Sequence, residues 1–266
     1  MNGEMRTTSS SCPSSRSYGR DSIFGIPFFR LNREQLLTRF REGLAEGDRI
    51  RFGYLNIAVA NQAYSNPQVS ALLKEIECIY IDGAGISWGL RILGKEPTKR
   101  HTGADFFPDV MELCAQEGRT VGFLGGHPGS ARKIAEIYRN RFPNLEVVFV
   151  CDGFGELQKT AWVEKSLTEN PPDLLMVGMG VPRQEEWIHD NREKYPVKVY
   201  WSVGALFEYD SGSLRRCPAW MGRAGLEWLF RLYCEPGRLW KRYLIGNPLF
   251  LLRCLSSRLR GREGTS

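Results

Sequence analysis

The sequence predicts an α/β protein: a mostly parallel, Rossmann-like sheet with flanking helices, followed by a basic, amphipathic helical appendage at the C-terminus. Short apolar runs alternate with stretches of helical periodicity, and strands joined through helices pair in parallel by right-handed crossovers. Several of these runs end in Gly-rich turns. Charge then separates the C-terminal segment from the rest. Residues 215–266 hold eleven Lys or Arg and three Glu, a balance of +8 within a chain whose total is +6, so the remainder sums to −2.

The individual strands and helices are expected from apolar runs and from capping signals, taken in chain order. Asn32 with Gln35 resembles a capping box, and Asn66 followed by Pro67 marks a second helix start. The expected strands are 23–29 (broken by Pro27), 51–59, 78–81, 120–124, 145–150, 174–177 and 197–203. The expected helices cover 32–40, 67–76, 86–93, 110–115, 131–138, 162–167, the residues after Pro182, and 226–233.

Composition limits the classes of protein that the chain can belong to. A hydrophobic content of 42% with 25% charged residues is that of a soluble globular chain. Its apolar stretches fall short of the ~18 residues that suggest a spanning helix, and no signal peptide is expected. The seven cysteines are scattered without a C-x-x-C pair, which favours reduced thiols in the cytoplasm. The three histidines have no metal-like spacing, so we expect no metal.

We divide the chain into three parts. Residues 1–21 are rich in Ser, Arg and Gly without periodicity and are expected to be a disordered tail. Residues 22–214 form the α/β domain in which we place the active site. Residues 215–266 interleave aromatic and Leu side chains with cations, which is typical of a membrane-associating segment. A helical cap with a solvated basic face is the alternative, whereas nucleic-acid binding lacks a recognition motif.

The central candidate for chemistry is Asp82, which directly follows the apolar run 78–81. In open α/β sheets, ligands bind beyond the carboxyl ends of the strands. Arg100 and Thr102 return in a Gly-bearing loop that can reach the same crevice. A carboxylate facing a fixed cation suits a reaction that removes a proton while an anionic group leaves. The alternative is that Asp82 only forms an Asp-Gly turn.

Two further loops follow strands and could hold a ligand. Gly125 and Gly126 open a Gly-rich turn before a helix, where backbone N–H groups favour phosphate; an ordinary βα turn is the alternative. Gly178 and Gly180 lead into a helix whose first turn crowds Arg183, Gln184 and Glu185, an arrangement suited to sugar or nucleotide hydroxyls or, alternatively, to plain capping. Neither loop is a convincing NAD fingerprint, and no nucleophile elbow is present.

Read together, these loops resemble the WecG/TagA/CpsF family of bacterial glycosyltransferases (glycosyltransferase family 26). The matching segments are Leu55-Asn56, I-D-G-A-G, R-H-T-G-A-D, F-L-G-G-H-P-G, D-L-L-M-V-G-M-G-V-P-R-Q-E-E-W and L-E-W-L-F-R-L-Y-C-E-P-G-R-L-W-K-R-Y, in order from about residue 23 to 252. The resemblance implies transfer of a sugar from a UDP-sugar to a polyprenyl-diphosphate-linked sugar, with inversion and with neither a required metal nor a cofactor.

The resemblance also implies roles for individual residues. The family's catalytic residues fall on Asp82 as the base, Arg100 and Gln184. The substrate-binding candidates are Tyr54, Asn56, Thr102, Gly125, Gly126, Phe154, Gly178, Gly180, Arg183, Glu208, Arg231 and Arg238. Phe154 stands near where the family holds uracil, Glu208 replaces a nucleotide-contacting Asp, and the two arginines of the appendage would reach the diphosphate. Tyr54 replaces the family's usual Thr, and Ala58 its usual acidic residue, which leaves the sugar's identity open.

We therefore predict an inverting transferase that moves a hexose or N-acetylhexosamine, with N-acetylmannosamine leading, in surface-polysaccharide or cell-wall polymer synthesis. A base that strips the acceptor hydroxyl contributes typically ~10²–10⁴-fold, and fixed cations stabilise the departing UDP. A glucosyltransferase of the same family is the first alternative. A non-catalytic nucleotide-binding module, an NAD-dependent enzyme, and a glycosidase using Glu185 or Glu186 are further ones. The expected location is cytoplasmic, on the inner face of the cell membrane, with homo-oligomers allowed and no nucleic-acid partner.

Overall fold

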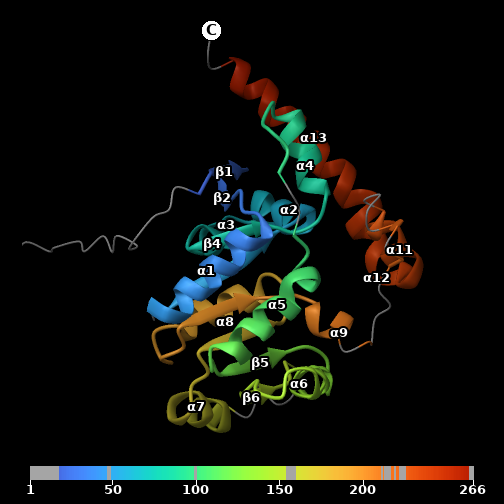
Figure 1. The fold of residues 1–266 in the computed structure, drawn as a ribbon. Coiled ribbons are helices and arrows are strands. Elements are labelled where there is room, and N and C mark those ends of the chain that lie inside the picture. The colour runs from blue at the N-terminus through green and yellow to red at the C-terminus, as the bar shows by residue number, and fades with distance from the viewer. Residues whose placement is uncertain are drawn as a thin grey trace, which may run out of the picture.

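A six-stranded parallel sheet forms the centre of the molecule (Figure 1). The computed structural model describes residues 18–46, 49–98, 101–153, 160–210, 212, 217–218, 220–221 and 226–263. The strand order is β4-β3-β8-β7-β5-β6, and every neighbouring pair is parallel. The strands are β3 (Ile50–Leu55), β4 (Cys78–Ile81), β5 (Val121–Gly125), β6 (Val147–Cys151), β7 (Leu174–Gly178) and β8 (Val199–Ser202). The predicted fold class is confirmed.

Helices cover both faces of the sheet, because successive side chains of a strand point to opposite faces. In β4, Cys78 and Tyr80 pack into one core cluster, while Ile79 and Ile81 pack into another. The first cluster includes α1 (Arg33–Glu46), α5 (Gly103–Gln116), α6 (Ser130–Arg141) and α9 (Leu206–Asp210). The opposite face carries α2 (Ile57–Ser65), α3 (Pro67–Lys74), α7 (Thr160–Glu169) and α8 (Arg183–Asn191), and α4 (Gly85–Ile92) follows β4.

Two expected strands are corrected at the N-terminal side of the domain. The run 23–29 is a hairpin of β1 (Arg20–Ile23) and β2 (Ile26–Phe29), which turns at Phe24 and Gly25 with φ of 53° and 75°. β1 begins two residues inside the segment predicted as disordered, whereas residues 1–17 lie outside the described part. The run 51–59 is a strand only to Leu55, because Asn56 caps a helix that takes up the remaining apolar residues.

The C-terminal segment is helical, as predicted, and its last helix belongs to the core of the domain. It consists of α11 (Glu227–Cys234), α12 (Pro236–Trp240), a π-helical turn η1 (Lys241–Ile245) and α13 (Gly246–Glu263). Phe250 and Cys254 of α13 are fully buried in the cluster that contains α2 and α4. Arg253 donates to the backbone O of Asn61 (3.0 Å) and to Ser65 Oγ (2.7 Å) on α2. The boundary at residue 215 therefore remains a prediction.

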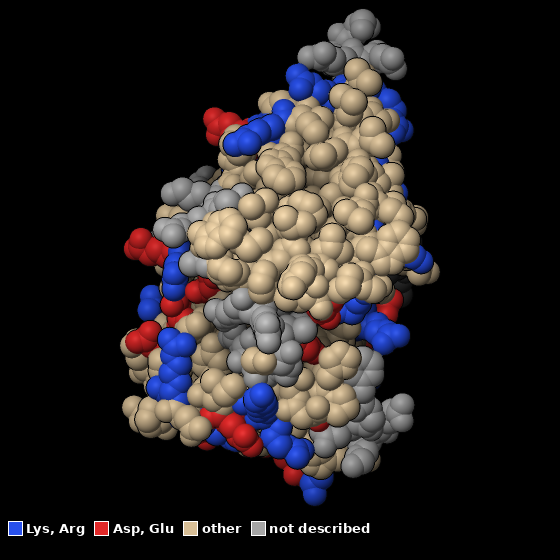
Figure 2. Space-filling model, turned by 90° about the vertical axis from the view of Figure 1, so that its right-hand side faces the viewer, with Lys and Arg blue, Asp and Glu red and all other residues tan. Residues whose placement is uncertain are grey.

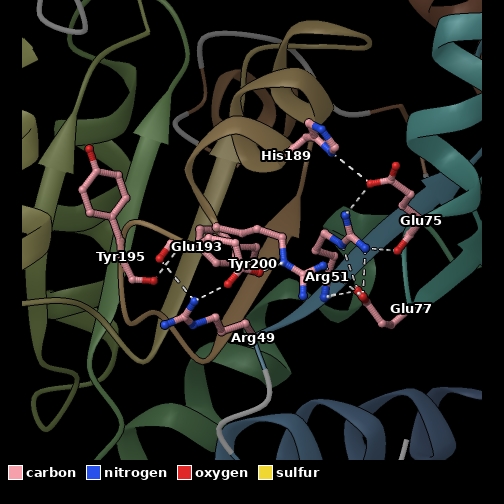
Figure 3. Close-up of polar contacts among 9 residues, drawn as sticks. Arg49, Arg51, Glu75, Glu77, His189, Glu193, Tyr195 and Tyr200 are labelled. Carbon is pink, nitrogen blue, oxygen red and sulfur yellow. Dashed lines mark hydrogen bonds and ion pairs between the residues drawn. The ribbon is translucent and has the colours of Figure 1, made fainter. Parts of the chain in front are cut away.

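At the amino ends of the strands, an ion-pair network around the buried Arg51 joins β3, the loop before β4, and α8 (Figure 3). The Arg51 guanidinium lies 2.9 Å from Glu77 Oε1 and 3.2 Å from Glu75 Oε2, and His189 Nδ1 lies 2.9 Å from the same Glu75 oxygen. Burial acts to raise the pKa of Glu77, but the hydrogen bonds and charge of Arg51 outweigh it and lower that pKa. The charged side chains at the amino ends of the strands thus pair with one another. The cleft lies at the opposite, carboxyl ends.

Candidate active site

A cleft that is open to solvent lies at the carboxyl ends of β3 and β4. One wall consists of residues that follow these strands, and the other consists of residues from α11, η1 and the start of α13. The lining residues are Asn56, Ile57, Ala58, Asp82, Gly83, Ala84, Gly85, Trp88, Thr102, Glu227, Trp228, Arg231, Arg242, Tyr243 and Asn247. The cleft therefore joins the sheet domain to the C-terminal helices around one half-buried aspartate.

Strand pairing and one amide hold Asp82 in place. Leu55 and Ile81 are partners in the β3–β4 ladder, and the N–H of Asp82 donates to the Leu55 carbonyl at 3.0 Å. Asn56 Oδ1 accepts from the N–H of Val59 (3.1 Å) as the cap of α2. Its Nδ2 donates to Asp82 Oδ2 at 3.3 Å. Because the helix engages the oxygen of this amide, its amino group is left to face the carboxylate.

The surroundings raise the pKa of Asp82 above its ordinary value. Burial is the largest cause. The charge of Arg231, the hydrogen bond from Asn56 and the charge of Arg242 act in the lowering direction, while the charge of Glu227 raises the pKa. A carboxylate with a raised pKa holds a proton more strongly, which makes it a better general base once it is ionised. The balance of charges around Asp82 is therefore suited to proton removal.

The second wall supplies cations and aromatic rings. Arg231 and Glu227 lie one turn apart on α11 and form an ion pair at 2.5 Å. Arg242 and Tyr243 of η1 line the cleft beside them, and the rings of Tyr243 and Trp228 have centroids 6.0 Å apart. This arrangement can bind an anionic group next to a flat polar ring, with the Asp82 carboxylate on the opposite wall.

The structure brings four of the predicted site residues together in this cleft: Asn56, Asp82, Thr102 and Arg231. Thr102 is buried at the start of α5, where the chain returns after pairing the N–H of His101 with the Ile81 carbonyl at 2.9 Å. Arg100 and Phe154 lie outside the described residues, so their predicted roles remain predictions.

Gln184, predicted as catalytic, is fully buried and does not line the cleft. Its Oε1 accepts from the N–H of Gly180 (3.1 Å) and of Gly204 (3.0 Å), and its Nε2 donates to Glu185 Oε1 at 2.7 Å. The side chain thereby joins the loop after β7 to the loop after β8. The geometry gives Gln184 a role in holding these loops rather than a contact with the cleft.

The Gly-rich loops after β5 and β7 pack against each other. Gly125 has a φ of 120°, and a Cβ there would lie 2.4 Å from the Gly178 carbonyl oxygen, so this close approach requires glycine at 125; a Cβ at Gly178 would lie 2.9 Å from the Gly204 carbonyl oxygen. Gly126 continues the contact, its N–H donating to the Gly178 carbonyl oxygen at 2.7 Å. Gly180 has a φ of 75° at the start of the loop that Gln184 holds. None of these four glycines lines the cleft.

Carboxylates already occupy part of the loop that was expected to contact phosphate. Glu208 Oε1 accepts from the N–H of His127 (3.2 Å), and Asp152 Oδ2 accepts from the N–H of Gly129 (2.8 Å). Because both N–H groups have a partner, the loop differs from the open phosphate cradle that the sequence suggested. Glu208 thus supports the loop and does not line the cleft.

The other predicted contacts also lie away from the cleft. Tyr54 fits its hydroxyl against Gly204, where a Cβ would be 2.5 Å away, and burial raises its pKa well above the ordinary value. Arg183 is exposed at the start of α8. Arg238 is paired with Glu235 at 2.6 Å, outside the cleft, and Arg242, one turn further on, lines it instead.

Sequence reasoning missed several lining residues: Trp88, Glu227, Trp228, Arg242, Tyr243 and Asn247. The run 86–93 predicted the helix that carries Trp88, but not that this side chain is 40% exposed and lines the cleft. The sequence shows arginines four residues apart at 238 and 242, but this spacing does not predict which of the two lines the cleft. Within the described ranges, no group of three or more His, Cys, Asp or Glu side chains is arranged to hold a metal ion.

A parallel α/β sheet with a carboxylate and cations at the carboxyl ends of its strands is an arrangement suited to enzymes that transfer a group from an anionic carrier. The particular family follows from comparison with known proteins. The chain belongs to the glycosyl transferase WecG/TagA/CpsF family, whose model matches residues 21–264. The resemblance noted in the sequence is thereby confirmed, and the protein is a glycosyltransferase of this family.

Two curated relatives carry the same name, N-acetylglucosaminyldiphosphoundecaprenol N-acetyl-beta-D-mannosaminyltransferase. The protein of Bacillus spizizenii (strain ATCC 23059 / NRRL B-14472 / W23) is 30% identical over 189 residues, which cover 71% of this chain and 72% of the relative. The protein of Bacillus subtilis (strain 168) is 28% identical over 190 residues, covering 71% and 73%.

Proposed function

We propose that the protein transfers N-acetylmannosamine, or a closely related N-acetylhexosamine or hexose, from a UDP-sugar to a polyprenyl-diphosphate-linked sugar. The observation that supports this most directly is the cleft itself, in which Asp82, held by Asn56, faces Arg231 and Arg242. The names of the two relatives support an N-acetylmannosaminyl group and an N-acetylglucosaminyldiphosphoundecaprenol acceptor. The product would be an intermediate of a surface polysaccharide or cell-wall polymer.

The reaction is a single displacement that inverts the anomeric carbon. The acceptor hydroxyl oxygen forms a bond to that carbon as the bond to the UDP oxygen breaks, and the hydroxyl proton passes to Asp82. Negative charge grows on the departing diphosphate, where Arg231 and Arg242 stabilise it more in the transition state than in the ground state. Arg100 keeps its predicted role as a further cation at this point.

The test is a transfer assay with radiolabelled UDP-sugars and a lipid-diphosphate acceptor, run on the wild type and on Asp82→Asn. The variant keeps the shape of the side chain and removes the base, so transfer should fall by roughly 10²–10⁴-fold while UDP binding persists. UDP binding is measured by calorimetry on the same preparations. Transfer by Asp82→Asn at the wild-type rate would remove Asp82 as the base.

A glucosyl or other hexosyl donor is the second candidate, and Ala58 is the observation that favours keeping it. Ala58 lines the cleft at the position where the family resemblance implies an acidic residue. A missing carboxylate changes which sugar hydroxyls or amides the cleft can bind. A screen of UDP-sugars, read by mass spectrometry of the lipid-linked product, separates the donors.

We further propose that the exposed apolar face of α11–α13 docks on the cytoplasmic surface of the cell membrane. Figure 2 shows a broad area without charged side chains on the side where these helices lie, with Lys and Arg at its edges. Its exposed members are Leu229, Tyr233, Trp240, Leu244, Ile245, Leu249, Leu252, Leu255 and Leu259. Among the described helices, none is both long and apolar enough to pass through a bilayer. Apolar groups ringed by cations match an anionic lipid surface.

Vesicle sedimentation tests this docking. The double variant Leu252→Glu/Leu259→Glu should lose binding to vesicles that contain anionic phosphatidylglycerol, and wild-type binding should weaken as salt rises. Ile137→Glu is the matched control, because Ile137 is an exposed apolar residue of α6, far from these helices in the chain. Unchanged binding by the double variant would contradict the proposal. A wild type that is a dimer, and a double variant that is a monomer, would assign the face to a second copy of the chain.

A further inference from the structure

The cleft contains a second carboxylate, Glu227, which neutralises one of the two arginines expected to meet the donor. Glu227 and Arg231 pair at 2.5 Å, and both side chains are about a quarter exposed (26% and 25%). They project from the same face of α11 into the cleft, one turn apart. The pair lies within electrostatic reach of Asp82, because the two charges shift its pKa in opposite directions.

A diphosphate that enters this cleft meets a conflict. An arginine binds a carboxylate and a phosphate with the same planar set of N–H donors, so the two acceptors compete for Arg231. A diphosphate placed beside the ionised Glu227 is also repelled by it. The cleft is thus arranged so that binding UDP requires Arg231 to exchange, or share, its carboxylate partner.

We propose that Glu227 stands in for the diphosphate: it pairs with Arg231 and competes with UDP for this arginine. The proposal rests on the proposed function, since it assumes a nucleoside-diphosphate donor. Its consequence is that Glu227 weakens the binding of the product UDP and promotes its release. Glu227 is a positioning residue in this scheme, because it acts through Arg231.

A purely structural role for Glu227 gives the opposite result. An acidic residue in the first turn of α11 stabilises the helix through its dipole, and a salt bridge holds the turn. If that were all, replacing Glu227 would loosen the cleft wall and weaken UDP binding. The sign of the change in affinity therefore separates the two roles.

Calorimetric titration with UDP of the full chain is the test, with Glu227→Gln, Arg231→Gln and the double variant. Glu227→Gln should tighten UDP binding by roughly three- to tenfold, and Arg231→Gln should weaken it. In the Arg231→Gln background, Glu227→Gln should tighten UDP binding less than it does in the wild type, because the competition for Arg231 is gone and only the direct repulsion by Glu227 remains. Glu235→Gln is the matched control: Glu235 makes the equivalent pair with Arg238 outside the cleft, and UDP affinity should stay unchanged.

A second readout is the pH dependence of kcat/KM for Glu227→Gln. The charged groups that act on Asp82 are Arg231 and Arg242, which lower its pKa, and Glu227, which raises it. Losing the Glu227 charge should move the acid limb of the profile to lower pH. Wild-type UDP binding together with unchanged or weaker binding by Glu227→Gln would overturn the inference. Absence of UDP binding by the wild type would instead overturn the proposed function on which it rests.

Discussion

At the residue scale, Asp82, the proposed base, depends on a neighbour whose two polar atoms have separate roles. Asn56 Oδ1 caps α2 through the N–H of Val59, and its Nδ2 donates to Asp82. An aspartate at position 56 keeps the cap but places a second negative charge beside the carboxylate. Such a substitution separates the role of Asn56 in the fold from its role in the cleft.

Asn56→Asp should therefore lower kcat, because a like charge raises the pKa of Asp82 further and reduces the fraction of the carboxylate that is ionised at a given pH. The acid limb of the kcat profile should move to higher pH, with activity partly recovered in alkaline buffer. Asn66→Asp is the control, since Asn66 caps α3 in the same way and does not line the cleft. A drop in activity without a change in the pH profile would contradict this account.

Arg238 and Arg242 should differ in how much each contributes to UDP binding. Arg242 lines the cleft, whereas Arg238 is 54% exposed and paired with Glu235. Arg242→Gln should raise the Kd for UDP by roughly tenfold, the loss of one charge-assisted contact, and Arg238→Gln by less than about twofold. Calorimetry with UDP measures both. Equal losses for the two variants would contradict this expectation and support the predicted role of Arg238.

At the scale of elements, local signals predicted most helix starts and strand ends to within two residues; the exceptions are the strand expected over 51–59 and the helix expected from 110, which begins at Gly103. The reciprocal Asn32–Gln35 capping box forms as expected, with both bonds at 2.8 Å. The run 51–59 misled because its second half, from Ile57 to Val59, is apolar for a helix face rather than for a strand. Periodicity over so few residues does not distinguish the two, and the deciding feature was the cap at Asn56.

The contact between α4 and α13 provides the test at this scale. A Cβ at Gly89 would lie 2.5 Å from the Phe250 ring and 3.0 Å from Cys254 Sγ. Gly89→Ala should therefore destabilise the protein by about 1–3 kcal/mol through overpacking, although Ala favours helix. Gly246→Ala, at a helical glycine with only ordinary 3.7 Å neighbours, should gain up to about 1 kcal/mol. Urea unfolding measures the change in stability of both variants. A stabilising Gly89→Ala would show that α13 shifts to accommodate the added methyl group at little cost.

At the scale of the whole molecule, half of the cleft could be predicted and half could not. Asn56, Asp82 and Thr102 lie next to strand ends or in the loop that returns to them, so the rule for parallel sheets places them together. Glu227 and Arg242 come from helices about 150 residues further along the chain. Their approach depends on how α13 packs on α2 and α4, which no local pattern encodes.

The stability of the whole molecule should depend on the protonation of Glu185. Burial raises its pKa to about 7, with the hydrogen bond from Gln184 acting in the lowering direction. Between its ordinary value of 4.5 and 7, the folded state keeps a proton that the unfolded state has lost, so stability falls as pH rises through this window. The change is about 3 kcal/mol, and it is complete above pH 7.

Glu185→Gln should remove this dependence. The variant keeps an acceptor for Gln184 and should be more stable than the wild type at pH 8, with little difference at pH 4.5. Urea unfolding at the two pH values checks this. Glu186→Gln, at the exposed neighbouring position, should behave like the wild type. Parallel curves for Glu185→Gln and wild type would contradict the prediction.

The bonds between α13 and α2 have one more consequence. Asn61 Nδ2 donates to the Gly246 carbonyl at 2.7 Å, and Arg253 donates to the Asn61 carbonyl at 3.0 Å. Helix α13, which we propose rests on lipid, is thus hydrogen-bonded to α2, whose cap residue Asn56 orients Asp82. With α13 docked on lipid as proposed, Asp82 lies at a fixed distance from the lipid headgroups. This distance limits which lengths of lipid-linked acceptor can reach it. The enzyme would favour sugars one unit above the diphosphate and pass over longer lipid-linked chains.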